Sequence, residues 1–233
     1  MVANEVEKIF GIKIISQDNY EHALTHPSYT KNKGLPYDEC YERLEFLGDA
    51  VLKLAVSNIL YRDYPNYSEG QMSKIRSIIV SDSVLAKVAN KIGLSDLIIA
   101  DSHEIKQGIK KLESVTACAF EAVLGAYFLD GKFKELLDVL EKLFKDYILE
   151  VDNNFEKYNA KAILQEYTQG KTKETPVYKL VETQGAEHNK TFVVEVFYQG
   201  EVIASGSGKS KKDAEQHAAY SACEKLGVVN VAK

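Results

Sequence analysis

The spacing of apolar residues changes near residue 150, and this change constrains the fold more than any other feature of the sequence. Before it, apolar residues recur at helical intervals, as in the segment 41–64, where Pro65 ends the pattern. After it, a short helical pattern is followed by three β-rich runs and a last helix at 209–227. The sequence therefore predicts an all-α domain followed by a small α-β-β-β-α domain.

The expected boundaries are an all-α domain at residues 1–150, a linker at 151–158, and the α-β-β-β-α domain at 159–228. The proposed linker is polar and uneven in pattern, which is typical of a connection between domains. Within the second domain, Gln199 and Gly200 separate two β-rich runs, and such a pair predicts a tight hairpin.

Small residues recur on the last helix, at Ala214, Ala218 and Ala222. Residues four apart share one face of a helix. We expect this seam to let the helix lie close against the predicted sheet.

Charge and cysteine content exclude several classes of protein. The chain of 233 residues has a formal net charge of −5, and the whole excess lies in residues 1–150, which hold 18 basic and 23 acidic side chains. This balance argues against a protein that coats nucleic acid through bulk positive charge, so any such binding must use local patches. The three cysteines are far apart and form no CxxC pair, which argues against a disulfide framework and indicates a cytoplasmic protein.

The sequence also argues against membrane association. No stretch approaches 18 uninterrupted apolar residues, so we expect no transmembrane helix. The first residues are acidic and lack a long apolar run, so we expect no signal peptide.

Carboxylates gather in unusual places in the first domain. Glu42, Glu45 and Asp49 have the spacing of one helix face, within a strongly apolar segment. Glu121 lies in the apolar helix predicted at 113–131, where a carboxylate is costly to bury unless it is paired or binds a metal. One interpretation is a solvated acidic face. The other is an oxygen-rich Mg²⁺ site, in which the ion activates water and stabilises charge on a phosphodiester.

The segment ERLEFLGDAVL (42–52) resembles the signature of the ribonuclease III family. Further matches follow in HALTHPSY (22–29), EGQMSKIRSIIV (69–80) and FEAVLGAYFLDG (120–131), and the tail resembles a double-stranded-RNA-binding domain. The resemblance implies a Mg²⁺-dependent homodimeric endoribonuclease that cuts double-stranded RNA. It also implies 5′-phosphate and 3′-hydroxyl ends with a short 3′ overhang, and a role in rRNA or mRNA processing.

The resemblance assigns roles to the acidic residues one by one. Glu45, Asp49 and Glu121 match metal ligands of the family. Glu42 and Glu69 match further acidic residues of its catalytic set, which we interpret as supporting substrate or dimer contacts. An aromatic residue that the family inserts into its partner at the dimer interface is matched by Phe46.

Cys118 departs from the family pattern, which usually has Asp three residues before the glutamate of the FEA motif. A thiol is a poor ligand for a hard cation such as Mg²⁺, so this fourth ligand position is doubtful. A retained water can fill the gap. We expect cleavage to survive but to be weakened or shifted toward Mn²⁺, and the alternative is a protein of the same fold that binds double-stranded RNA without cutting it.

The second domain supplies the features that an A-form duplex requires, namely polar groups for the minor groove and a basic clamp for the phosphates. On its first helix, Gln165, Glu166 and Gln169 are placed to meet 2′-hydroxyls, and His188 in the following loop matches a family minor-groove contact. The clamp is predicted at the start of the last helix, where the helix dipole also favours phosphate. It comprises Lys209, Ser210, Lys211 and Lys212.

Other functional assignments are weaker. His22 and His26 have a spacing found in zinc sites, but Pro27 follows at once and no HExxH glutamate is present, so a structural role is expected. The GKS tripeptide at 208–210 lacks the spacing of an ATP-binding loop. A metal-dependent hydrolase of free nucleotides would need no second domain.

Overall fold

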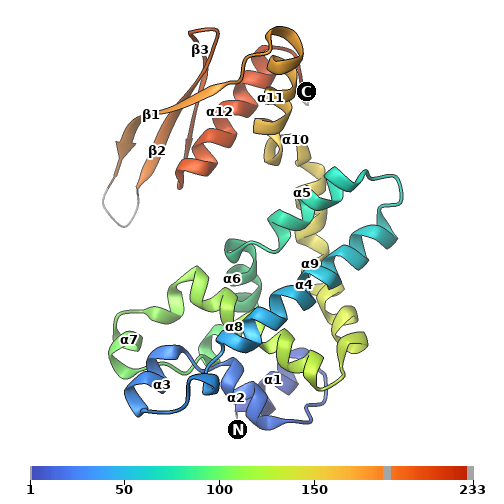
Figure 1. Ribbon diagram of the computed structural model, residues 1–233, viewed down its shortest axis with the longest axis vertical. Helices are drawn as coiled ribbons and strands as arrows, with labels where there is room; N and C mark the ends of the chain where they lie inside the picture. Colours follow the sequence, from blue (N-terminus) through green and yellow to red (C-terminus); the bar gives the residue numbers. More distant parts are fainter. Residues whose placement is uncertain (1, 186–189, 230–233) are drawn as a thin grey trace. The chain divides into compact units, whose positions relative to one another are not determined.

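Helix α8 (Glu113–Leu129) forms the centre of the helical part of the protein (Figure 1). Its sequence is apolar all round, and eleven of its 17 residues are buried. Two other helices, α4 (Glu42–Asp63) and α6 (Asp82–Lys91), pack against it. Because α4 carries the predicted acidic face, this packing determines where the acids meet residues of α8.

The computed structural model describes residues 2–185 and 190–229, and the chain divides into a helical unit, residues 1–150, and a sheet unit, residues 151–233. The other α-helices that begin in the helical unit are α1 (Val2–Phe10), α2 (Gln17–Ala23), α3 (Pro27–Lys33), α5 (Glu69–Ile79), α7 (Ser102–Lys106) and α9 (Phe133–Asn153). Short 3₁₀ turns lie at η1 (Tyr37–Glu39), η2 (Leu94–Leu97) and η3 (Ile109–Lys111).

Two glycines allow α4 and α8 to approach backbone to backbone. A Cβ atom added at Gly48 would lie 1.7 Å from the carbonyl oxygen of Glu121. One added at Gly125 would lie 2.4 Å from the carbonyl oxygen of Leu44. Both distances are far below van der Waals contact, so this helix crossing requires a residue without a side chain on each helix.

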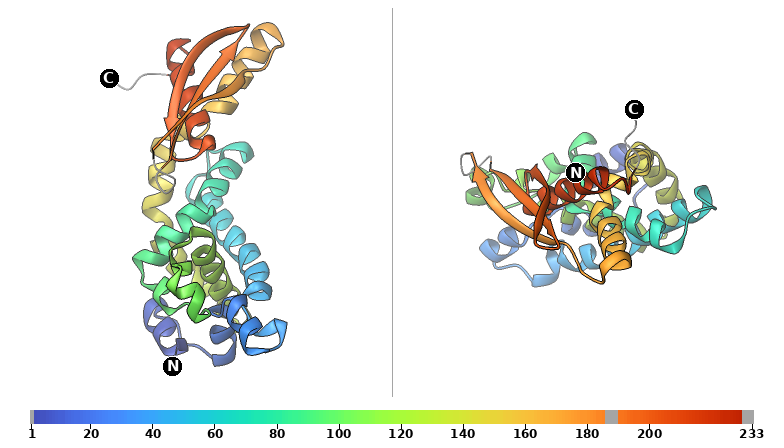
Figure 2. Two further views of the ribbon diagram at one scale, coloured as in Figure 1. Left: turned by 90° about the vertical axis from the view of Figure 1, so that its left-hand side faces the viewer. Right: turned by 90° about the horizontal axis from the view of Figure 1, so that it is seen from above.

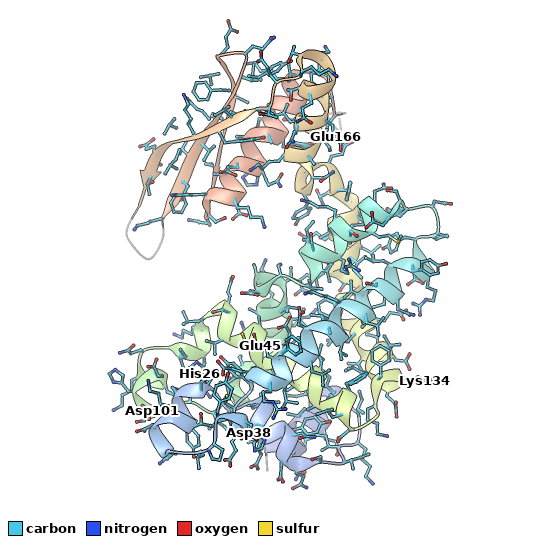
Figure 3. The ribbon with its side chains drawn as sticks, viewed as in Figure 1. His26, Asp38, Glu45, Asp101, Lys134 and Glu166 are labelled. Atoms are coloured by element: carbon cyan, nitrogen blue, oxygen red, sulfur yellow. The ribbon has the colours of Figure 1, made fainter. Side chains whose placement is uncertain are left out.

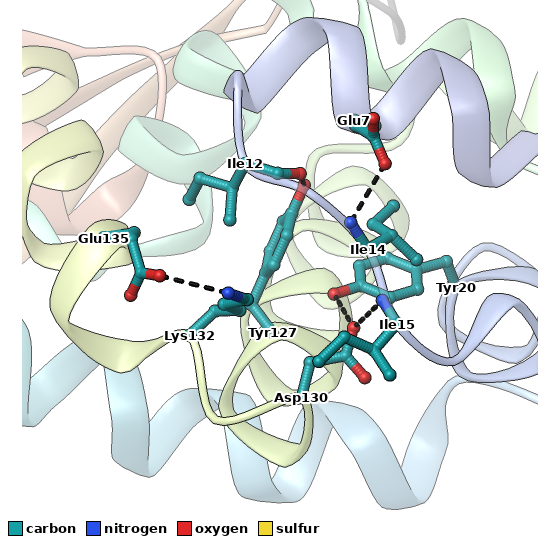
Figure 4. Close-up of polar contacts among 9 residues, drawn as sticks. All are labelled: Glu7, Ile12, Ile14, Ile15, Tyr20, Tyr127, Asp130, Lys132 and Glu135. Atoms are coloured by element: carbon teal, nitrogen blue, oxygen red, sulfur yellow. Dashed lines mark hydrogen bonds and ion pairs between the residues drawn. The ribbon is translucent and has the colours of Figure 1, made fainter.

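The end of α8 anchors the segment that joins α1 to α2 (Figure 4). The Asp130 carboxylate accepts hydrogen bonds from the backbone N–H of Ile15 at 2.8 Å and from the Tyr20 hydroxyl at 2.9 Å. The Tyr20 ring also meets the Tyr127 ring edge to face, with 4.9 Å between ring centroids. These contacts join residues more than 100 positions apart in the sequence.

The sheet unit is built on an antiparallel sheet with strand order β1-β2-β3. The strands are β1 (Val177–Gln184), β2 (Thr191–Tyr198) and β3 (Glu201–Gly208). Between β2 and β3, Tyr198 pairs with Glu201, and Gln199 and Gly200 both have positive φ angles, of 53° and 82°. This is the two-residue turn that matches the twist of a hairpin, as predicted.

Two helices, α11 (Ala160–Thr172) and α12 (Lys211–Lys225), complete the sheet unit (Figure 2). The alanine seam of α12 is fully buried with Val194 and Val196 of β2. A Cβ atom added at Gly206 of β3 would lie 2.1 Å from the backbone nitrogen of Ala218, so the helix and strand touch at backbone level. The predicted α-β-β-β-α order is confirmed.

The segment 151–158 is more regular than the sequence indicates. Helix α9 continues to Asn153, and a single turn, α10 (Phe155–Tyr158), follows it. The apolar residues Leu136, Leu140 and Phe144 of α9 recur every four positions and are buried.

In the part of the chain that the structure describes, no helix is long and apolar enough to cross a membrane.

Candidate active site and RNA-binding surface

Acidic side chains from three helices line one open depression in the helical unit. Glu45, labelled in Figure 3, lies on α4, and its neighbours in the depression come from α6, α8 and the η1 turn. The lining residues are Tyr37, Glu42, Glu45, Phe46, Asp49, Lys53, Val80, Asp82 and Glu121. The structure thus brings four of the five predicted acidic residues to one place.

The geometry follows from the helix crossing described above. Glu45 and Asp49 lie one turn apart on α4, on either side of Gly48 in the sequence. Because the backbone of Glu121 meets α4 at Gly48, its side chain enters the same depression. The predicted set of Glu45, Asp49 and Glu121 is therefore assembled by one contact between α4 and α8.

The depression is electrostatically unfavourable for further negative charge. Burial raises the pKa of Glu121 to about 8, and the charges of Asp49, Glu45 and Asp82 raise it as well. Burial also raises the pKa of Glu45, and the neighbouring charge of Glu42 adds to this effect. These are the pKa shifts expected where carboxylates share a partly desolvated site, and a bound cation would reverse them.

Lys53 is the one basic residue that lines the depression among the described residues. Its Nζ contacts the Asp49 carboxylate at 2.7 Å, and its charge acts to lower the pKa of Glu121. A set of carboxylate oxygens is the donor type that Mg²⁺ prefers, so the chemistry of this depression fits a hard divalent cation. As placed, no three His, Cys, Asp or Glu side chains in the described ranges lie close enough to hold one ion, so binding requires side-chain rotation.

Cys118 lies one helical turn before Glu121 on α8 and is half-buried. Its thiol acts to lower the pKa of Glu45, against the larger effect of burial, which raises that pKa. Burial, together with the charge of Glu45, raises the pKa of Cys118 to about 12. The thiol is therefore neutral at pH 7.

Asp82 was not predicted as a site residue, yet it lines the depression from the first turn of α6. The sequence offers Ser81, Asp82 and Ser83 as a helix start, where such residues are common for local reasons, so no signal marks Asp82 as functional. Only the packing of α6 against α8 reveals its position.

Glu69 is placed elsewhere. It is the first residue of α5, accepts a hydrogen bond from the Ser73 hydroxyl at 2.8 Å, and lines a separate depression with Arg76. Arg76 donates to the Ser57 hydroxyl at 2.7 Å. The structure thus does not bring Glu69 together with the other four acids within one chain.

Phe46 is 83% exposed at the edge of the acidic depression. A second depression next to it includes Leu44, Leu47 and Leu129. A large aromatic side chain so exposed beside apolar residues is typical of an interface.

The predicted minor-groove residues of the sheet unit lie on one exposed side of α11. Leu164 and Thr168 bury the opposite side, so Gln165, Glu166 and Gln169 face solvent (Glu166 is labelled in Figure 3). His188 lies outside the described residues.

The predicted basic clamp lies at the start of α12, with Lys209, Lys211 and Lys212 exposed. Ser210 is the N-cap of this helix, and its hydroxyl oxygen accepts a hydrogen bond from the backbone N–H of Asp213 at 3.1 Å. Ser210 therefore has a structural role, because its cap determines where the helix that carries Lys211 and Lys212 begins. The free backbone N–H groups of the first turn add to their positive potential.

His26 has the structural role that was expected. Its ring nitrogen Nδ1 accepts from the backbone N–H of Ser28 at 3.0 Å and caps α3, whose first residue is Pro27.

An all-helical unit with a carboxylate-lined depression, joined to an α-β-β-β-α unit with a basic helix start, defines an endoribonuclease that acts on double-stranded RNA. Residues 17–148 match the family model described as Ribonuclease-III-like, and residues 160–226 match the double-stranded RNA binding motif. The chain belongs to the ribonuclease III family.

Relatives and a solved structure agree with this assignment. The chain is 37% identical over 228 residues to ribonuclease 3 of Syntrophobacter fumaroxidans, covering 94% of this chain and 92% of the relative. It is 40% identical over 209 residues to ribonuclease 3 of Borreliella afzelii, covering 90% and 85%. The nuclease domain of ribonuclease III from Campylobacter jejuni, with flexibility in a region involved in dimer formation, matches with a TM-score of 0.56 and 33% identity over 61% of this chain and 95% of that chain.

Proposed function

We propose that this protein cleaves double-stranded RNA with the help of Mg²⁺ held in the acidic depression, and that Mn²⁺ can replace it. The observation that carries the proposal is the convergence of Glu45, Asp49 and Glu121 through one helix crossing. Burial, together with the charges of neighbouring carboxylates, raises the pKa values of Glu121 and Glu45, so a bound cation would stabilise their ionised forms.

The residues of the chain perform distinct tasks. Glu45, Asp49 and Glu121 would hold Mg²⁺, which supplies charge neutralisation at the phosphodiester and activation of a water molecule. Lys53 holds Asp49 by an ion pair. The sheet unit positions the duplex through its basic helix start, which leaves cleavage to the helical unit. Attack by water at phosphorus would break the P–O3′ bond, so that O3′ leaves as the proposed 3′-hydroxyl and the phosphate stays on the 5′ end. Offset cuts in the two strands would leave the proposed short 3′ overhang.

We further propose a homodimer in which Phe46 packs against a second copy. The exposure of this ring beside a partly apolar depression supports the assignment. Paired active sites would account for cleavage of both strands, and processing of rRNA or mRNA precursors is the proposed cellular role.

The three cysteines are unpaired in the structure, in agreement with a reducing cytoplasm.

The test is cleavage of a labelled RNA duplex by purified protein with and without Mg²⁺, alongside Glu121→Gln. We expect metal-dependent cutting by the wild type and a loss of at least a hundredfold in the variant, because a ligand charge is removed without a change of shape. Glu113→Gln, which removes an exposed acid from the first turn of the same helix, is the matched control. Cutting retained by Glu121→Gln would show that the metal site is assigned to the wrong residues.

A second candidate function, binding of double-stranded RNA without cleavage, is favoured by one observation. Cys118 stands where the family pattern has an aspartate, and its raised pKa of about 12 keeps the thiol neutral at pH 7. Cys118→Asp discriminates the two, since a fourth carboxylate would strengthen a weakened site. We expect the wild type to cut and the variant to cut faster in Mg²⁺, whereas silence of the wild type with duplex binding intact would support the second function.

A further inference from the structure

We propose that Asp82 supplies to the bound cation the carboxylate that the site lacks at Cys118. The inference rests on the proposed metal-dependent function and adds a residue to its site. It follows from the position of Asp82 among the acids of the depression and from the chemistry of the Cys118 thiol.

Cys118 does not supply a ligand for a hard cation. Sulfur is a poor ligand for Mg²⁺. The wall of the depression formed by α8 therefore offers one carboxylate, Glu121, to such a cation. The missing negative charge must come from another helix if the site is to hold the cation well.

Asp82 meets this requirement from α6. It lines the same depression as Glu45 and Asp49 of α4 and Glu121 of α8. Its side chain is therefore within reach of the space between these carboxylates. It is also exposed, so it can turn toward a cation.

A purely structural role for Asp82 predicts something different. As an acid in the first turn of α6, Asp82 also interacts favourably with the helix dipole, and its loss would then change stability without changing metal affinity. Glu113 occupies the same place on α8, outside the depression, and is exposed. Glu113→Gln is therefore a matched control for loss of an acid at a helix start.

The experiment measures Mn²⁺ affinity of the full-length protein by titration calorimetry and by electron paramagnetic resonance of free Mn²⁺, without RNA. We expect Asp82→Asn to weaken Mn²⁺ binding about tenfold, the usual effect of losing a residue that supports a metal site. Glu113→Gln should bind as the wild type does. Equal Mn²⁺ affinity in Asp82→Asn and the wild type would overturn the inference.

A double-mutant cycle tests the compensation itself. In the Cys118→Asp background the site has its usual fourth carboxylate, so Asp82→Asn should weaken Mn²⁺ binding by less than about threefold. The same tenfold loss in both backgrounds would show that Asp82 acts independently of Cys118 and would contradict the compensation. Absence of Mn²⁺ binding by the wild type would overturn the proposed metal site and this inference together, whereas binding unaffected by Asp82→Asn overturns the inference alone.

Discussion

At the scale of single residues, Glu121 shows that the acidic depression disfavours the ionised form of a carboxyl group. Its pKa of about 8 in the folded protein lies far above the ordinary value for a glutamate, because the side chain is partly buried next to Asp49, Glu45 and Asp82. Between about pH 4.5 and pH 8 the native state therefore binds a proton that the unfolded state has lost. By linkage, this group lowers the free energy of unfolding as the pH rises through that range.

A glutamine at this position removes the effect. Without divalent metal, the wild type should lose stability relative to Glu121→Gln between pH 5 and pH 8.5, by an amount on the order of 1 kcal/mol after allowance for solvent screening. Urea unfolding in EDTA at several pH values measures the difference, and Glu113→Gln serves as the control. Parallel pH profiles for the wild type and Glu121→Gln would show that Glu121 has no raised pKa.

At the scale of secondary-structure elements, the crossing of α4 and α8 connects stability to function. Gly48 and Gly125 leave no room for a Cβ atom, and the acids of the depression flank this contact. A side chain at either glycine would force the helices apart and would move Glu121 away from Glu45 and Asp49. The fold and the proposed metal site therefore depend on the same two positions.

Gly48→Ala tests this dependence. We expect the free energy of unfolding to fall by about 3 kcal/mol, because the new methyl group overlaps the backbone of α8. Urea denaturation measures the fall, and Mn²⁺ affinity should weaken with it. Gly70→Ala on α5 is the control, because a Cβ atom there meets nothing within 4 Å and alanine favours a helix. Equal stability of the wild type and Gly48→Ala would show that the helices are not in backbone contact.

At the scale of the whole molecule, the two units differ in net charge and in the arrangement of their charged residues. The net charge of −5 lies entirely in residues 1–150, where the acids of the depression account for part of it. The other residues are neutral overall, yet Lys209, Lys211 and Lys212 gather at one helix start. Local arrangement, and not total charge, suits each unit to its task.

The contribution of the lysines is measurable through salt. Replacing Lys209, Lys211 and Lys212 together with alanine should lower the slope of log affinity against log salt concentration by about 3, one for each lost phosphate contact. Fluorescence anisotropy of labelled duplex RNA measures the slope. The protein also carries Glu121→Gln in this experiment, so that the RNA is not cleaved. Lys179→Ala, whose ammonium group lies over the Phe197 ring on the sheet, provides a control that should change the slope little. An unchanged slope in the triple variant would place the phosphate contacts elsewhere.

The proposed homodimer also makes a prediction at this scale. Phe46→Asp should convert a dimer into a monomer at micromolar concentration, because it places a charge at the centre of an apolar contact. Sedimentation velocity detects the change, and the similarly apolar, exposed Val202 of the sheet unit supplies the control Val202→Asp. A dimer that persists in Phe46→Asp would remove this residue from the interface.

Much of this protein is encoded in local patterns of its sequence. Apolar periodicity predicts α4 and α8, the Gln199-Gly200 pair predicts the hairpin, and the alanines predict the buried seam of α12. Each of these signals acts over a few residues, within the range where backbone geometry and side-chain spacing determine structure. The sequence also predicts the acidic face of α4 and the unusual position of Glu121, because both depend only on the spacing of residues within one helix.

Contacts between distant segments were decided only by tertiary packing. Asp82 lines the acidic depression because α6 packs against α8. Glu69, the first residue of α5, lines a different depression with Arg76. The raised pKa of Glu121 likewise requires helices that are distant in the sequence to meet. Burial and through-space charge depend on neighbours that are remote in the chain, and no local pattern of residues specifies those neighbours.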